Sequence, residues 1–335
     1  SSLLFHPPSD FEAFAATSNG SVDSTVEIND FTDGGPDLEN NEYFGSSIAN
    51  IGDLDGDGVD DLAVGAYHVD APAGSSGLER GAVFIMFMND EGGVKSTVEI
   101  NASTDDGPAL SRKDHFGRSV ANMGDLDGDG VNDLAVGAFS DDAQGSNSGT
   151  VHIMFMDITG YPKSTVEINE TEAYRPTLDA HDNFGFSVAN IGDLDGNGVN
   201  DLAVGAFNGR GAVHIIFLNS DGTLTKQSVE INDSTTSLEL VDNDNFGYSV
   251  ANMGDLDGDG VNDLAVGAKG DNDAAEAGDG NDRGAVHIIF MNDEGGVKST
   301  VEINDTTAYG PDLKNKDYFG SSIANIGDLN GNGVN

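Results

Sequence analysis

A repeated acidic segment is the feature that most restricts how this chain can fold. "GDLDGDGVDDLAVGA" at 52–66 returns almost unchanged at 124–138, 192–206 and 254–268, and a partial copy, "GDLNGNGVN", occupies 327–335. Phe-Gly pairs mark the same period, and their phenylalanines are Phe44, Phe116, Phe184, Phe246 and Phe319. Successive pairs are 62 to 73 residues apart. This period exceeds that of ankyrin or leucine-rich repeats and matches one four-stranded propeller blade with generous loops.

Four strand-like runs occur in each period, exemplified by "FGSSIAN", "DLAVGA", "GAVHIIF" and "STVEIN". They are rich in valine, isoleucine and phenylalanine, and Gly, Asn and Asp separate them. The third run is apolar on both faces, as in a strand between two packed sheets. In the fourth run only Val98 and Ile100 form an apolar face, because Thr97 and Glu99 alternate with them. These patterns predict an all-β fold, a β-propeller of four-stranded blades with the fourth strand outermost.

Charge and composition exclude several classes of partner. The formal net charge of −45 repels nucleic acid and anionic membranes and attracts cations, although high acidity also maintains solubility at high salt. The longest apolar runs, such as "AVFIMFM" at 82–88, are too short to span a bilayer, so direct membrane insertion is not expected. The chain has no cysteine, and therefore no disulfide supports the fold.

The acidic segment has the spacing of a cation-binding loop. Asp53, Asp55 and Asp57 alternate along a glycine-containing turn, followed by the Val59 carbonyl and then Asp61. Carboxylates brought this close repel one another unless a hard cation lies among them, and calcium prefers six to eight oxygen ligands. The loop is not an EF-hand, because its twelfth residue is Val64 rather than a bidentate glutamate.

The same positions recur in each copy and predict about four to five structural calcium sites. The equivalent residues are Asp125, Asp127, Asp129, Val131 and Asp133; Asp193, Asp195, Asn197, Val199 and Asp201; Asp255, Asp257, Asp259, Val261 and Asp263; and Asp328, Asn330 and Asn332. The third copy carries one charge fewer and is expected to bind somewhat more weakly. The ninth position of the fifth copy would follow Asn335, so only three ligand residues are predicted for this copy.

These motifs resemble FG-GAP repeats, the blades of the integrin α-subunit propeller. The resemblance runs from Phe44-Gly45 through "DLAVGA" into the following Gly-Ala-Val strand and extends over nearly the whole chain. It implies a calcium site in the loop between the first two strands of a blade. This sequence departs from the family in two ways. The family's Gly-Ala-Pro is Gly-Ala-Tyr, Gly-Ala-Phe or Gly-Ala-Lys here, and integrin-type propellers have seven blades whereas this chain has four full units and a remainder.

The residues outside the four full units can form one further blade. Residues 319–325 match the first strand, 24–29 the fourth, 10–17 the third, and 1–5 can stand in for the second. We therefore expect a single domain, 1–335, of five blades closed by both termini, with units beginning near 44, 116, 184, 246 and 319 and with 1–43 completing the last. The alternative is part of a seven-bladed propeller or of a longer array.

Two other recurrent features have a structural and a functional interpretation. His152, His214 and His287 share the strand position of Phe84, which indicates packing rather than catalysis. His115 and His181 precede a Phe-Gly pair, and no Ser or Cys nucleophile motif accompanies them. We therefore expect no enzymatic activity. Asn101, Asn169, Asn232 and Asn304 each begin an Asn-x-Ser/Thr sequon, whereas Asn29 does not. They are glycosylation candidates in a eukaryotic secreted protein, or else copies of a turn sequence.

The sequence as a whole predicts a secreted or cell-surface, calcium-binding propeller that serves as an adhesion or structural module. Its expected partner is a protein or glycan ligand, bound by the variable loops after "VGA", especially 69–80 and 269–283. Two alternatives remain at this stage: a carbohydrate-binding, lectin-like propeller, and the non-catalytic domain of a surface hydrolase.

Overall fold

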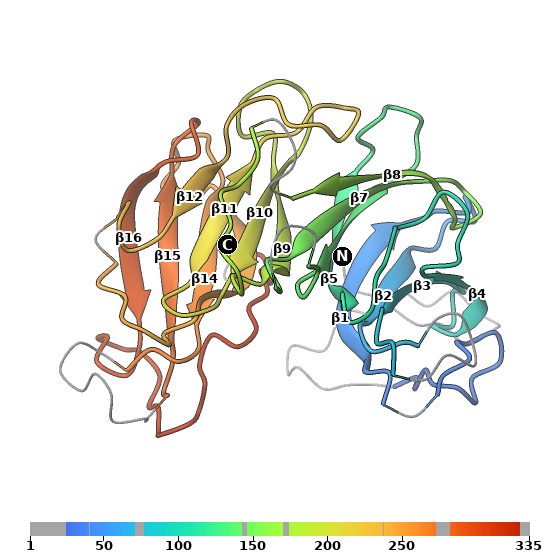
Figure 1. Ribbon diagram of the computed structural model, residues 1–335, viewed down its shortest axis with the longest axis horizontal. Coiled ribbons are helices and arrows are strands. Elements are labelled where there is room, and N and C mark those ends of the chain that lie inside the picture. The colour runs from blue at the N-terminus through green and yellow to red at the C-terminus, as the bar shows by residue number, and fades with distance from the viewer. Residues whose placement is uncertain are drawn as a thin grey trace, which may run out of the picture.

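Four antiparallel sheets of four strands each make up the fold of the computed structural model (Figure 1). The structure describes residues 25–39, 41–70, 77–142, 146–169, 174–236, 238–272 and 282–328. Within each sheet the strands follow in chain order, so each repeat folds as one meander. No helix of the described residues is long and apolar enough to cross a membrane.

The strand bounds agree with the predicted repeat. The first sheet contains β1 (Phe44–Gly52), β2 (Asp61–Ala66), β3 (Ala82–Met88) and β4 (Val94–Ile100). The second contains β5 (Phe116–Gly124), β6 (Asp133–Ala138), β7 (Thr150–Met156) and β8 (Pro162–Ile168). The third contains β9 (Phe184–Gly192), β10 (Asp201–Ala206), β11 (Ala212–Ile216) and β12 (Val229–Ile231). The fourth contains β13 (Phe246–Gly254), β14 (Asp263–Ala268), β15 (Ala285–Met291) and β16 (Val297–Ile303).

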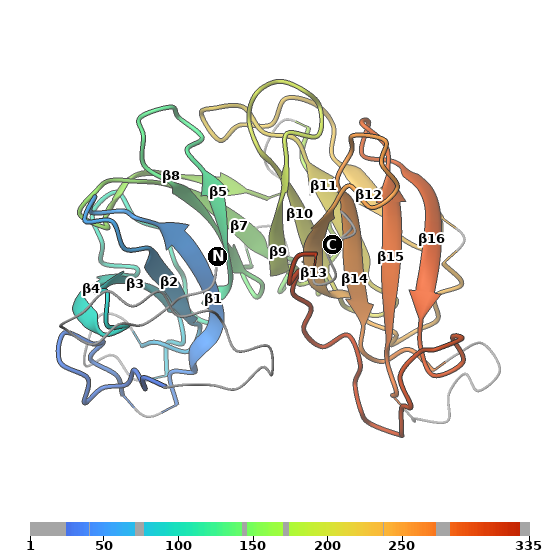
Figure 2. The ribbon, with the colours of Figure 1, turned by 180° about the vertical axis from the view of Figure 1, so that it is seen from behind.

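The sheets follow one another around an arc, as blades of a propeller do. The first strands β1, β5, β9 and β13 contact one another in that order, and the fourth strands lie farthest from this row (Figures 1 and 2). The all-β, propeller-type prediction is therefore confirmed, with four four-stranded blades among the described residues. Five blades and closure by the termini remain predictions.

The two described pieces assigned to a fifth blade are not in strands. Residues 25–29 and 323–328 have no regular secondary structure, and Phe319 makes only an isolated bridge to Gly284. A first or fourth strand needs a neighbour that supplies its ladder hydrogen bonds, and the described residues provide none for these two segments. Residues 1–24 and 329–335, which carry the rest of that prediction, lie outside the described residues.

The core lies between adjacent sheets. Ile85 and Phe87 of β3 pack with Phe116 and Val136 of the next blade, in one of three clusters that join neighbouring blades. Strands β3 and β7 are buried along their whole length, as predicted from their two apolar faces. The outer face of the first blade is exposed at β1: Ile48 is 63% exposed, whereas Val120 at the same position of β5 is 8% exposed, and Val64 and Phe84 on the same face as Ile48 are each 2% exposed. The predicted fifth blade would lie against this face.

Asparagines at the ends of the first strands connect the blades in series. The side-chain Nδ2 of Asn122 donates to the backbone oxygen of Asn50 at 3.0 Å, and Asn190 repeats this bond to Asn122 at 2.9 Å. Asn252 and Asn325 continue the series, each at 3.0 Å. The recurrent "AN" of the first strand therefore fixes the spacing of neighbouring blades.

The repeated histidine lies in the core, as its exchange with Phe84 predicted. His152 pairs with Val136 across the sheet and contacts the Phe116 ring edge-on at 5.3 Å, and neither of its ring nitrogens has a hydrogen-bond partner. Phe84 makes the equivalent edge contact with Phe44 in the first blade, at 5.6 Å. Burial lowers the pKa of His152 to about 4, because the charged form cannot be solvated there.

Replacing His152 with phenylalanine should stabilise the protein, most strongly in acid. The unfolded chain binds a proton near pH 6.5 and the folded one only near pH 4, so stability is lost as pH falls through this window. The loss amounts to roughly 3 kcal/mol, and His152→Phe removes it. Urea unfolding at pH 7 and pH 4.5 would measure the difference. Buried aspartates titrate alike in the wild type and in His152→Phe. If the free energy of unfolding depended on pH equally in the two proteins, the expectation would be wrong.

Candidate metal centre

Each acidic loop joins the first strand of a blade to the second, and all four lie at the same end of the sheets. In the first blade β1 ends at Gly52 and β2 begins at Asp61. Carboxylate oxygens within 4.8 Å of one another come from Asp53, Asp55 and Asp57; Asp125, Asp127 and Asp133; Asp193, Asp195 and Asp201; and Asp255, Asp257 and Asp259. Each cluster includes the first and third positions that the sequence singled out, together with the fifth position in the first and fourth loops and the ninth position in the second and third loops.

Backbone hydrogen bonds hold the loop around its first aspartate. Asp53 accepts from the backbone nitrogens of Asp57 at 2.9 Å and Gly58 at 2.8 Å. Gly56 and Gly58 have φ values of +78° and +93°, a region that glycine enters without strain. The second and fourth loops repeat these bonds at Asp125 and Asp255. This turn aims the alternate side chains at one region.

The ninth-position aspartate has a structural role as well. Asp61 is fully buried, and its two oxygens accept from the backbone nitrogens of Leu54 at 3.0 Å and Met88 at 2.8 Å. Asp133, Asp201 and Asp263 make the same pair of bonds. Burial raises the pKa of Asp133 and of Asp201 to about 6. This residue therefore connects the loop to the end of the third strand.

The remaining predicted ligands are the carbonyls of the seventh-position valines and the residues of the fifth loop. The side chains of Val59, Val131, Val199 and Val261 are partly buried against the four core clusters, and their carbonyls remain predicted ligands. Asp328 lies in the described part of the chain, whereas Asn330 and Asn332 lie outside it.

A lysine that sequence reasoning missed lies against three of the four loops. The Nζ of Lys95 is 2.7 Å from Oδ2 of Asp55 and also contacts Asp57. Lys163 makes the same contacts with Asp127 and Asp129, and Lys298 with Asp257 and Asp259. Hydrogen bonds from these lysines lower the pKa of Asp57 and of Asp259. The signal in the sequence was a lysine at the second position of the fourth strand, as in "VKSTVEI".

The donor set fits a hard divalent cation. All side chains in the clusters offer oxygen, and no histidine belongs to any of them among the described residues. The exposed loop leaves room at Gly56 and Gly58, where an added Cβ would meet nothing within 4 Å. Carboxylate and backbone oxygens are the ligands that calcium takes six to eight at a time, whereas magnesium requires a stricter octahedron.

The sequon asparagines form turns in the structure. Oδ1 of Asn101 accepts from the backbone nitrogen of Ser103 at 2.8 Å, and its Nδ2 donates to Glu99 at 2.6 Å. Asn232 and Asn304 do the same with Glu230 and Glu302, and Asn169 is buried. Asn29, which has no sequon, forms the identical turn with Phe31 and Glu27. Turn geometry alone therefore explains the repeated asparagine, and glycosylation remains a prediction.

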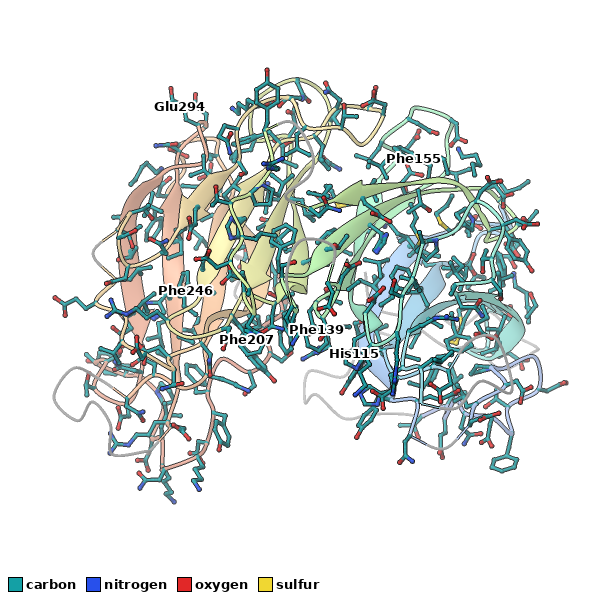
Figure 3. The ribbon with its side chains drawn as sticks, viewed as in Figure 1. His115, Phe139, Phe155, Phe207, Phe246 and Glu294 are labelled. Atoms are coloured by element: carbon teal, nitrogen blue, oxygen red, sulfur yellow. The ribbon has the colours of Figure 1, made fainter. Side chains whose placement is uncertain are left out.

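A row of aromatic rings crosses the blades at the opposite end from the acidic loops. His115 stacks on Phe139 at 5.1 Å, Phe139 meets Phe186 at 5.2 Å, and Phe186 meets Tyr248 at 4.6 Å. Tyr67 and Phe207 extend this aromatic row, and Figure 3 shows His115, Phe139 and Phe207 together at one edge of the sheets. The Cζ of Arg118 lies 3.9 Å from the Phe186 ring centre, and Nζ of Lys269 lies 3.7 Å from that of Tyr248.

Comparison with known proteins agrees with the repeat geometry. The FG-GAP repeat model matches residues 44–86, 116–154 and 246–289. Integrin alpha-4 of Xenopus laevis is 35% identical over 165 residues, which cover 49% of this chain and 14% of that protein. Integrin alpha-IIb of Homo sapiens is 32% identical over 252 residues, which cover 71% of this chain and 22% of that protein. The chain thus spans a small part of the relatives' length.

Among solved structures, the exotype rhamnogalacturonan lyase YesX aligns with 81% of this chain and 47% of its own, at 17% identity and a TM-score of 0.38. No function follows from a likeness at that level. The family match falls instead on the Phe-Gly strands and acidic loops described above. The chain therefore contains FG-GAP repeats and is similar to the integrin α subunits.

Proposed function

We propose that this chain is a calcium-stabilised, extracellular interaction module in which one end of the blades binds calcium and the other binds a protein ligand. The observation that carries the proposal is the aromatic row, which continues across four blades and includes partly exposed rings at Tyr67 and Tyr248. Aromatic side chains and arginine, here Arg118, are enriched at protein interfaces. The similarity to integrin α subunits supports an adhesion role and a cell-surface or secreted location.

The acidic loops and the aromatic row lie at opposite ends of the blades, and we assign a different role to each end. In β2, Asp61 lies at the calcium end and Ala66 at the aromatic end, five residue steps or about 17 Å apart. Calcium at the loops would therefore act on the ligand-binding end through the stability of the blade rather than by direct contact. His152 and His214 are buried, which keeps these two side chains from any substrate.

Cell attachment to the immobilised protein tests this proposal. Tyr67→Ala should reduce attachment at least about five-fold, because it removes a ring from the aromatic row. Tyr161→Ala is the matched control, since Tyr161 is also exposed but lies in the turn between β7 and β8, at the calcium end. Equal attachment by the two variants would contradict the placement of the binding surface.

A glycan array separates the second candidate from the first. Aromatic rings also stack on sugars, so a carbohydrate ligand shares this chemistry. Retention of defined glycans by the wild-type protein, lost in Tyr67→Ala, would favour a lectin-like function. Attachment that survives removal of cell-surface glycans but not of cell-surface protein would favour the protein ligand.

A further inference from the structure

We propose that Lys95, Lys163 and Lys298 are tethered cations: in the calcium-free protein each ammonium occupies part of the metal position in its own blade, and calcium binds by displacing it. This inference rests on the proposed calcium function of the loops. It concerns which loops bind tightly and how the metal-free protein keeps its shape.

The contacts place each ammonium among predicted ligand atoms. Nζ of Lys95 touches Oδ2 of both Asp55 and Asp57, and these residues belong to the oxygen cluster of the first loop. Lys163 and Lys298 repeat the arrangement, with Nζ 2.9 Å from Asp127 and 2.6 Å from Asp257. The same geometry recurs in three blades, so the contact belongs to the repeat rather than to one blade.

The fold explains the position. The hairpin between the third and fourth strands lies at the same end of the blade as the acidic loop, because Asp61 binds the backbone nitrogen of Met88, where β3 ends. The lysine is the second residue of the fourth strand, and its side chain is about one-third exposed. A side chain anchored there can contact the loop or turn outward to solvent.

The third blade lacks this lysine contact and is a natural comparison. One additional residue in its hairpin brings Thr225 to the place of Lys95, and the Thr225 hydroxyl donates to Asp195 at 3.3 Å. Lys226 lies farther away, with Nζ 3.8 Å from Asp195 and 3.8 Å from the centre of the Phe217 ring. This blade is also the one in which Asn197 replaces an aspartate. The loop with one carboxylate fewer is thus the loop without an ammonium between its carboxylates.

Displacement changes the expected order of affinities. Ligand charge alone predicts that the third loop binds calcium most weakly. In the other three loops, however, calcium must compete with a positive charge that is already in contact with two of its ligands. We therefore infer that the third loop binds calcium at least as tightly as the others. The lysines lower calcium affinity and reduce carboxylate repulsion in the metal-free state.

Substitution of the lysines by threonine, the residue of the third blade, tests the inference. Calorimetric calcium titration of the triple variant Lys95→Thr, Lys163→Thr and Lys298→Thr should show about ten-fold tighter binding at three sites. Its melting temperature should fall in EGTA, where the aspartates then repel without compensation, and equal or exceed that of the wild type in saturating calcium.

Two controls exclude a general effect of surface charge. Lys226→Thr removes a charge next to the third loop that does not lie between two carboxylates, and Lys314→Thr removes an exposed charge from the chain after β16. Lys314→Thr should change calcium affinity less than about two-fold, and Lys226→Thr should raise the affinity of the third loop less than a single tethered-cation variant raises that of its own loop. Affinity gains in these controls equal to that of a single tethered-cation variant would overturn the inference.

The titration also separates this inference from the function on which it rests. Calcium binding by the wild type with unchanged affinity in the triple variant would overturn the lysine inference alone. Binding by the triple variant but not by the wild type would support the lysines as competitors and contradict calcium stabilisation of the natural chain. Binding by neither protein would overturn both.

Discussion

Removal of calcium should lower the melting temperature of this protein by about 15 °C. A site at one hundred times its dissociation constant stabilises the folded state by about 2.7 kcal/mol, and four independent sites therefore contribute about 11 kcal/mol. For a chain of this length the entropy of unfolding converts such a loss into a shift of that size. The unfolded chain cannot compete for the ion, because the loops depend on backbone bonds such as that from Gly58 to Asp53.

Differential scanning calorimetry in EGTA, with and without excess calcium, would measure this shift. Magnesium in place of calcium should restore only a minor part of it, since a strict octahedron is difficult to build from these loops. A melting temperature that is the same in EGTA and in calcium would refute the calcium assignment. The tethered cations moderate the effect, so the triple lysine variant should show a larger difference between the two conditions than the wild type.

The repeat made most of the fold predictable from the sequence. Strand positions, their order within a blade and the outermost place of the fourth strand all follow from alternation and period, because these depend on residues close in the chain. The first, third, fifth and ninth positions of the loop were predictable for the same reason. Asp61 shows the limit: its spacing indicated a ligand, but its bond to Met88, 27 residues away, depends on how the strands pack.

Features that depend on neighbouring hairpins or neighbouring blades could not be predicted. Lys95 is 40 residues from Asp55, and nothing local indicates that the two meet. In the sequence, the only sign of the aromatic row was that Tyr67 and Phe139 replace the proline of Gly-Ala-Pro. The row is continuous because Arg118 and Phe186, from the following blades, contact these rings. The number of blades remains a prediction for the same reason, since closure is a contact between distant ends.

Gly137→Ala is expected to destabilise the protein strongly, although the substitution adds only one methyl group. Gly137 is the glycine of "VGA" in β6, and a Cβ there would lie 1.8 Å from the backbone oxygen of Gly185 in the next blade and 2.5 Å from Oγ of Ser119. That hydroxyl donates to the same oxygen at 2.8 Å, so the missing side chain makes room for an interblade hydrogen bond. Gly65, Gly205 and Gly267 have the same close approach in the other blades.

The direction of the stability change distinguishes this interblade contact from a glycine in an isolated strand. In an isolated strand, alanine is favoured over glycine by about 0.5–1 kcal/mol, and Gly137 has no positive φ that would reverse the preference. Between two packed blades the added methyl must instead move backbone, and the interior has no free volume to absorb the shift. We expect a loss of at least about 3 kcal/mol in the free energy of unfolding, measured by urea denaturation in saturating calcium.

Gly209→Ala provides the control for this substitution. Gly209 has a φ of +65° and open space around its Cβ position, so alanine there should cost only the backbone strain of about 1 kcal/mol. If the interblade contact is the cause, Gly137→Ala should also speed amide hydrogen exchange in β6 and in β9, which lie on the two sides of the contact, and leave β14 unchanged. Equal losses for the two alanine variants, or exchange that rises uniformly through all four blades, would show that the close approach of Gly137 to Gly185 does not hold neighbouring blades together.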